Sequence, residues 1–91
     1  MKLRCTAMKN QLAISPNKQE VFNAFIRDLV RKYKLTNEVN GFGDRDYFYN
    51  NVLMFTIYDD GETGEVTGLD EPISTIDEFI ENLKIAFSNV K

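Results

Sequence analysis

Residues 47–58 read YFYNNVLMFTIY, and this stretch decides the fold class. Two runs rich in aromatic and β-branched residues flank Asn50-Asn51, and asparagine tolerates the positive φ angles of a two-residue hairpin turn. The sequence therefore predicts two antiparallel strands joined by a tight turn. Because the run from Val52 to Tyr58 is apolar at both odd and even positions, we expect it to be a central strand.

A helix is predicted on the N-terminal side of this hairpin. It begins either at Ser15, with Pro16 in the first helical position, or at Asn17, with Glu20 completing a capping box. It ends near Leu35. Its apolar residues recur at helical spacing and form one stripe: Phe22, Phe25, Ile26, Leu29 and Tyr33.

A second helix is predicted on the C-terminal side. Ser74 or Thr75 caps it, and with Thr75 as the cap, Glu78 completes a capping box. Its apolar stripe consists of Ile76, Phe79, Ile80, Leu83 and Phe87.

The remaining segments complete the predicted domain. Residues 2–7 alternate between apolar and polar side chains, which is typical of a half-buried strand. Residues 37–45 read as a polar loop, residues 59–64 as a turn and residues 65–69 as a short strand. We therefore expect one α+β domain over residues 1–91, in which two amphipathic helices cover a small antiparallel sheet in the order β-α-β-β-β-α.

Composition argues against several classes of function. The chain has no histidine and one cysteine, Cys5, so it lacks an imidazole base, an internal disulfide and a Cys- or His-based metal site. No nucleophile lies beside a recognisable base, and no glycine-rich phosphate loop is present. We therefore expect a protein that is not an enzyme and that uses no cofactor and no metal.

Targeting signals are also missing from the sequence. No apolar run reaches the ~18 residues of a membrane-spanning helix, and the N-terminus lacks the apolar stretch of a signal peptide. We expect a cytoplasmic protein with no membrane partner. Nine asparagines against four alanines indicate an AT-rich coding sequence, which is common in low-GC bacteria, their phages and their mobile elements.

Charge is distributed very unevenly along the chain. Residues 1–36 carry eight basic and two acidic side chains, whereas residues 37–91 carry three basic and twelve acidic ones. No basic residue interrupts the nine acids between Asp59 and Glu81. The two parts either form solvated surfaces that attract each other weakly within the fold, or the acidic part is a docking patch for a basic partner.

The docking interpretation gives a specific set of candidate partner-binding residues: Asp59, Asp60, Glu62, Glu65, Asp70, Glu71, Tyr47 and Tyr49. The two tyrosines are included because tyrosine is enriched at interface hot spots. Alternatively, Phe48 packs in the core and the tyrosines cover the sheet edge.

The leading functional hypothesis is a small acidic inhibitor or antagonist that docks on a basic, nucleic-acid-handling protein such as a nuclease. Toxin-immunity proteins and phage anti-defence proteins such as anti-CRISPRs share this size and charge, although no motif places the chain in a family. One alternative is a nucleic-acid-associated regulator, whose basic face is Arg27, Arg31, Lys32 and Lys34. The net charge of −3 argues against direct nucleic-acid binding. Another alternative is a self-associating accessory protein, and the oligomeric state stays open.

Overall fold

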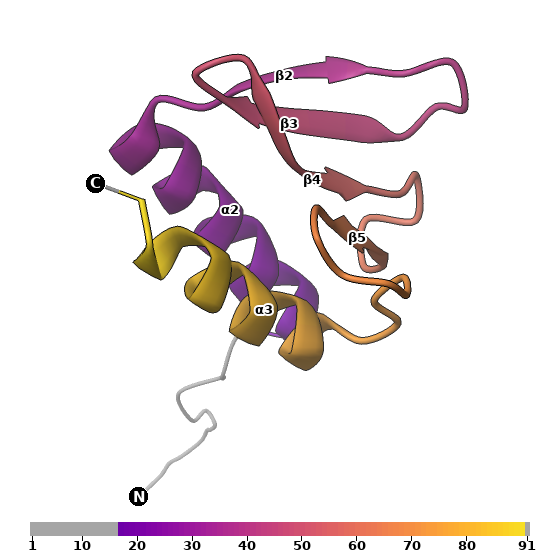
Figure 1. Cartoon of the computed structure of the whole chain (residues 1–91). Helices are drawn as coiled ribbons and strands as arrows, with labels where there is room; N and C mark the ends of the chain where they lie inside the picture. The colour runs from indigo at the N-terminus through magenta and orange to yellow at the C-terminus, as the bar shows by residue number, and fades with distance from the viewer. Residues whose placement is uncertain (1–16, 91) are drawn as a thin grey trace, which may run out of the picture.

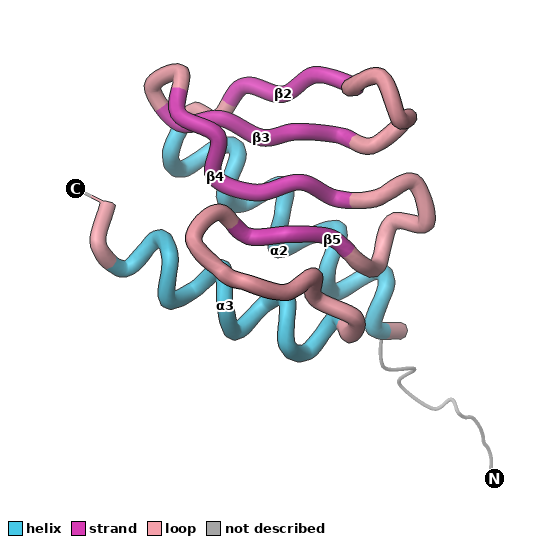
Figure 2. Tube along the Cα trace, turned by 45° about the vertical axis from the view of Figure 1, so that its right-hand side comes forward, coloured by secondary structure: helices cyan, strands magenta, loops and turns pink. Residues whose placement is uncertain are grey.

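A four-stranded antiparallel sheet forms one layer of the structure and two helices form the other (Figure 1). The computed structural model describes residues 17–90. Their elements are α2 (Lys18–Tyr33), β2 (Thr36–Val39), β3 (Arg45–Tyr49), β4 (Val52–Ile57), β5 (Gly64–Val66) and α3 (Ile76–Ser88). The strands follow one another across the sheet in the order β2-β3-β4-β5, and both helices lie on the same side of it (Figure 2).

The α+β class is confirmed, but the order of the described elements is α-β-β-β-β-α, which differs from the predicted one. The difference arises at Thr36–Val39, a strand paired with β3 where the sequence predicts a polar loop. All four of its side chains are exposed, so its composition carries no signal of burial. The strand predicted at residues 2–7 lies outside the described residues.

The predicted hairpin is confirmed. Asn50 and Asn51 adopt φ angles of 50° and 68°, as a tight two-residue turn requires. The strand after the turn, β4, is central because it pairs with both β3 and β5. The pairing register between β3 and β4 shifts after Tyr47, which leaves Met54 as an extra residue in a β-bulge.

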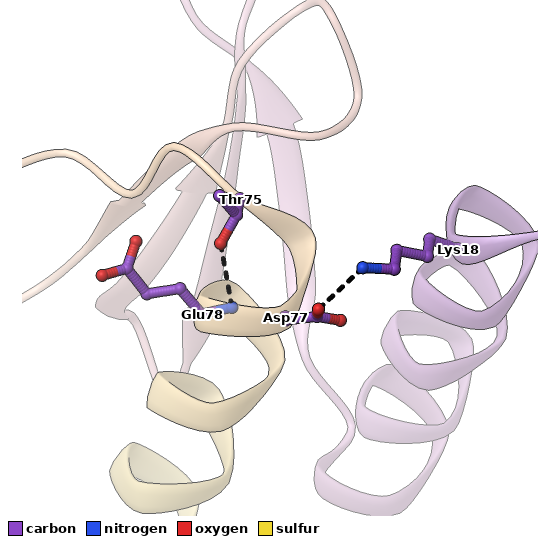
Figure 3. Close-up of polar contacts among 4 residues, drawn as sticks. All are labelled: Lys18, Thr75, Asp77 and Glu78. Carbon is purple, nitrogen blue, oxygen red and sulfur yellow. Dashed lines mark hydrogen bonds and ion pairs between the residues drawn. The ribbon is translucent and has the colours of Figure 1, made fainter.

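Both helices begin at caps that the sequence proposed. Asn17 and Glu20 form the reciprocal capping box at the start of α2. At the start of α3, the backbone N–H of Glu78 donates to Oγ1 of Thr75 at 3.2 Å. The side chain of Glu78 extends away from this cap (Figure 3), so the second capping box is only half formed.

The core lies between the helices and the sheet. Phe22 of α2, Phe55 of β4, and Phe79 and Leu83 of α3 are almost completely buried. The rings of Phe22 and Phe79 lie 5.1 Å apart, and that of Phe55 lies edge-on to Phe79 at 6.3 Å. At the helix ends, Nζ of Lys18 lies 2.8 Å from Oδ2 of Asp77 (Figure 3), but exposed pairs of this kind add little stability.

Gly64 provides the sharpest test of this packing. A Cβ atom there would lie 2.0 Å from the backbone oxygen of Thr56 and 2.8 Å from the ring of Phe79. We therefore expect Gly64→Ala to lower the free energy of unfolding by about 3 kcal/mol, at the upper end of overpacking costs. Urea denaturation measures it, with Gly41→Ala as the control, because a Cβ at Gly41 meets nothing within 4 Å. Equal midpoints for the two variants would contradict the close approach of β5 to α3.

Candidate functional site

A row of polar side chains crosses the sheet on the face opposite the helices. The register places Glu38, Asp46, Thr56 and Glu65 side by side on the four strands. Their neighbours in the adjacent row, Tyr47 and Phe55, are buried against the helices, and successive side chains of a strand point to opposite faces. The row therefore lies on the face that no helix covers.

Hydrogen bonds hold this row in place. Oγ1 of Thr56 donates to Oδ1 of Asp46 at 2.6 Å, and Nδ2 of Asn40 donates to the same oxygen at 3.2 Å. The hydroxyl of Tyr58 donates to Oε2 of Glu65 at 2.5 Å. This bond, together with the negative charges of Glu65 and Asp44, raises the pKa of Tyr58 to about 12. The carboxylates of Asp46 and Glu65 are thus held by neutral donors, whereas that of Glu38 accepts no hydrogen bond within the described residues.

The turn between β4 and β5 continues the negative charge at the end of the sheet. Asp59, Asp60 and Glu62 are exposed there, and the backbone N–H of Asp59 donates to Oδ1 of Asp44 at 3.1 Å. The same turn reaches the start of α2, where Nε2 of Gln19 donates to the backbone oxygen of Gly61 at 2.9 Å. We use the name acidic sheet face for the strand acids together with the acids of the adjoining loop and turn, a set of seven residues: Glu38, Asp44, Asp46, Glu65, Asp59, Asp60 and Glu62.

Asp60 also has a structural task in this turn. Its Oδ1 accepts from the backbone N–H groups of Glu62 and Thr63, and its Oδ2 accepts from Oγ1 of Thr63 at 2.6 Å. These bonds, the one from the Thr63 hydroxyl above all, lower the pKa of the Asp60 carboxyl below its ordinary value.

Basic residues lie elsewhere. Within residues 17–90, the strand positions on the helix-free side contain no lysine or arginine. Arg45 of β3 belongs to the opposite side, where its Nη1 donates to Oδ1 of Asn37 at 2.6 Å and its side chain faces α2 across a hollow. The sheet therefore separates its strand acids, Glu38, Asp46 and Glu65, from the arginines of α2, whereas Asp59 of the turn lines the same hollow as Arg27.

The structure brings together only part of the predicted docking set. Asp59, Asp60, Glu62 and Glu65 belong to the acidic sheet face, whereas Asp70 and Glu71 are exposed on the loop between β5 and α3. Sequence reasoning missed three members of this face: Glu38, Asp44 and Asp46. Asp44 and Asp46 are two residues apart, so the sequence predicts that both side chains point to the same side of a strand. Glu38 can be placed beside Asp46 only when residues 36–39 are recognised as a strand.

The expectation that Tyr47 and Tyr49 form an exposed aromatic pair is wrong. Tyr47 is only 8% exposed and stacks on Phe55 with ring centroids 4.6 Å apart. Tyr49 is half-buried and meets Tyr33 edge-on at 6.3 Å. The alternative, with Phe48 in the core, is wrong for the same reason: the strand turns its odd positions toward the helices and Phe48 away from them.

The residues of the predicted basic face of α2 line two different hollows. Arg27 and Arg31 line a hollow of about 350 Å³ beside Asn37 and Tyr47. Lys32 and Lys34 line another, near the C-terminal end of the helix. Lys32 places its Nζ 5.3 Å from the ring centroid of Tyr33, and Arg31 pairs with Asp28 at 3.3 Å. Arg27 and Arg31 thus border one hollow, and Lys32 and Lys34 border another.

Three further observations concern metal binding, membrane spanning and similarity to known proteins. In the part of the chain that the structure describes, no three acidic or cysteine side chains converge to hold a metal ion. Neither α2 nor α3 combines the length and apolarity needed to cross a membrane. Comparison with protein-family models, with curated proteins and with solved structures finds no match.

Asp60→Ala tests the acidic turn. We expect it to lower the free energy of unfolding by about 1 kcal/mol near neutral pH, because the turn loses three hydrogen bonds that are exposed to solvent. The pKa of the Asp60 carboxyl is lower in the folded chain than its ordinary value, so this contribution is fully present above the ordinary pKa and disappears as the pH falls through the folded pKa. Urea denaturation at several pH values measures the effect.

The control for this turn variant is Asp59→Ala, because the Asp59 carboxylate makes no hydrogen bond within the described residues. We expect the control to stay close to the parent at every pH. A stability loss for Asp60→Ala that is unchanged from neutral to strongly acidic pH would contradict the role of the ionised carboxylate.

Proposed function

We propose that this protein is a non-enzymatic inhibitor or antagonist that docks its acidic sheet face on a basic, nucleic-acid-handling protein in the cytoplasm. The observation that carries the proposal is the alignment of Glu38, Asp46 and Glu65 across the helix-free face, without a basic residue among the described residues of that face. Immunity proteins and phage anti-defence proteins are the functional classes that fit this proposal.

The physical basis is complementarity with surfaces built for phosphate. Proteins that bind nucleic acid neutralise phosphates with clusters of lysine and arginine. Glu38 and Asp46 sit on neighbouring strands, which lie about 4.8 Å apart, and Thr56 lies between Asp46 and Glu65. Because the sheet fixes these positions, little conformational entropy is lost when the carboxylates meet such a cluster. The bonds from Thr56 to Asp46 and from Tyr58 to Glu65 restrict two of these side chains further.

Charge separation also supports fast association. The negative field on one side of the sheet attracts a basic surface and orients it before contact, although the net charge of the chain is only −3. Salt shortens the range of this attraction to about 10 Å at 0.1 M ionic strength. The proposal therefore requires an association rate that falls steeply as salt is added.

The decisive variant reverses two acids that make no side-chain hydrogen bond within the described residues, Glu38→Lys with Glu62→Lys. Its matched control, Glu78→Lys with Glu81→Lys, makes the same change of charge on exposed positions of α3. The parent and both variants are immobilised and exposed to an extract of the cells that produce this protein. The proteins that each one captures are then identified. We expect the parent and the control to capture a basic protein that the Glu38/Glu62 variant loses.

Kinetics with the purified captured protein complete the test. Steering predicts an association rate at least about tenfold lower for the Glu38/Glu62 variant at low salt, with a smaller difference at high salt. A third variant, Arg27→Glu with Arg31→Glu, addresses the nucleic-acid alternative. Capture that survives the acidic reversal and is lost in this third variant would overturn the proposal.

A further inference from the structure

The outer edge of β2 has backbone groups available for another strand. Among the described strands, β2 lies at the end of the sheet and pairs only with β3. The backbone N–H of Asn40 donates to the backbone oxygen of Asp44 at 2.8 Å, which fixes the alternation of hydrogen-bonded pairs along the two strands. By that alternation, Asn37 and Val39 direct their N–H and C=O groups away from β3. Within residues 17–90, these groups have no hydrogen-bond partner.

One side of this edge opens on a groove lined by apolar and charged side chains. Two hollows of about 470 and 350 Å³ lie between α2 and the sheet, and both are lined by Ile26, Arg27 and Tyr47. The larger one extends to the end of β4, where Asp59 also lines it. Val39 borders the larger hollow with 57% of its surface exposed, and Asn37 borders the smaller one. Every second side chain of a strand added beside β2 would lie over this groove.

The other side of the same edge is the acidic sheet face. Glu38 is its outermost strand residue, and the register places Asp46 next to it. The intervening side chains of an added strand would therefore lie beside carboxylates. The edge thus selects for a segment that alternates between apolar side chains, directed at the groove, and basic side chains, directed at Glu38.

We propose that an extended segment of the basic partner adds to the edge of β2 as a strand, with alternating apolar and basic residues. This inference rests on the proposed function, because it names how the partner of the acidic sheet face is recognised. Main-chain hydrogen bonds would supply affinity, and the alternation of side chains would supply specificity. A second copy of this chain fits less well, because the antiparallel register that uses the outward groups of both Asn37 and Val39 places the like charges of two Glu38 side chains opposite each other.

A synthetic peptide tests the inference directly. The probe is acetyl-Lys-Val-Lys-Val-Lys-Val-Lys-amide, and its control is acetyl-Lys-Lys-Val-Val-Val-Lys-Lys-amide, which has the same composition and charge without the alternation. Each peptide is titrated into the isotope-labelled full chain, and amide chemical shifts are followed by NMR. We expect saturable shifts at residues 36–39 and along 26–31, with binding at least about fivefold weaker for the control, because only strict alternation suits both faces of an added strand.

Two variants of Val39 isolate the backbone contribution. Val39→Pro removes an N–H that faces outward, which an edge strand tolerates because pairing with β3 does not use it. We expect this variant to bind the alternating peptide at least about tenfold more weakly, while Val39→Thr, which keeps the N–H, stays within about threefold of the parent. Glu38→Lys provides an independent variant, and we expect it to weaken the alternating peptide more than Glu81→Lys does.

The outcomes separate this inference from the proposed function. Equal binding of the two peptides, or equal binding to the Val39→Pro and Val39→Thr chains, overturns strand addition while leaving docking through the acidic sheet face intact. If the amide shifts of residues 36–39 change with protein concentration before peptide is added, a second copy of the chain occupies the edge of β2, and strand addition by the partner is overturned. NMR contacts between residues 1–16 and β2 in the free chain would also overturn strand addition by the partner. Loss of charge dependence in the capture experiment instead overturns the proposed function.

Discussion

The packing of Phe79 is the contact on which the rest of the structure depends. Its side chain is completely buried, and its ring meets Phe22 of α2 and Phe55 of β4. It also fills the space that the missing side chain of Gly64 leaves on β5. One residue of the last helix therefore joins the first helix, the central strand and the edge strand β5. A domain of this size has little stability to spare, so these elements are expected to unfold together.

This packing also decides where the charges lie. Because both helices occupy one side of the sheet, Tyr47 and Phe55 must point toward them, and their neighbours Asp46 and Thr56 must point away. A shift of one residue in the register would exchange the two sets and bury a carboxylate. The hydrophobic core and the strand acids of the acidic sheet face thus result from the same strand register. Because a shifted register would bury a carboxylate at a high free-energy cost, that cost stabilises the observed register.

Particular residues show which parts of the fold and of the candidate site can be predicted from the sequence. Asn50-Asn51 and the stripes of both helices were predictable, because turn chemistry and helical periodicity are local. Within the stripe of α2, Phe22 is buried and Phe25 only partly so, a difference set by the neighbouring helix and sheet. Strand β2 was not predictable from composition because its pairing with β3, rather than burial, creates it. Without β2, Glu38 had no assigned face, and the docking set was drawn from consecutive acids instead.

The position of Glu38 connects the two proposals by one physical requirement. An exposed edge strand is a template for indiscriminate pairing, and proteins commonly limit this hazard by placing charge on the edge. On β2 the charge is a carboxylate, with Arg27 and Arg31 beside the groove on the other side of the strand. A second copy of the chain meets like charge on both sides, whereas a strand with basic residues on one side and apolar residues on the other meets no repulsion at Glu38. The Glu38 side chain that opposes self-association therefore also favours a basic partner. Solubility and partner recognition both require a carboxylate at this position.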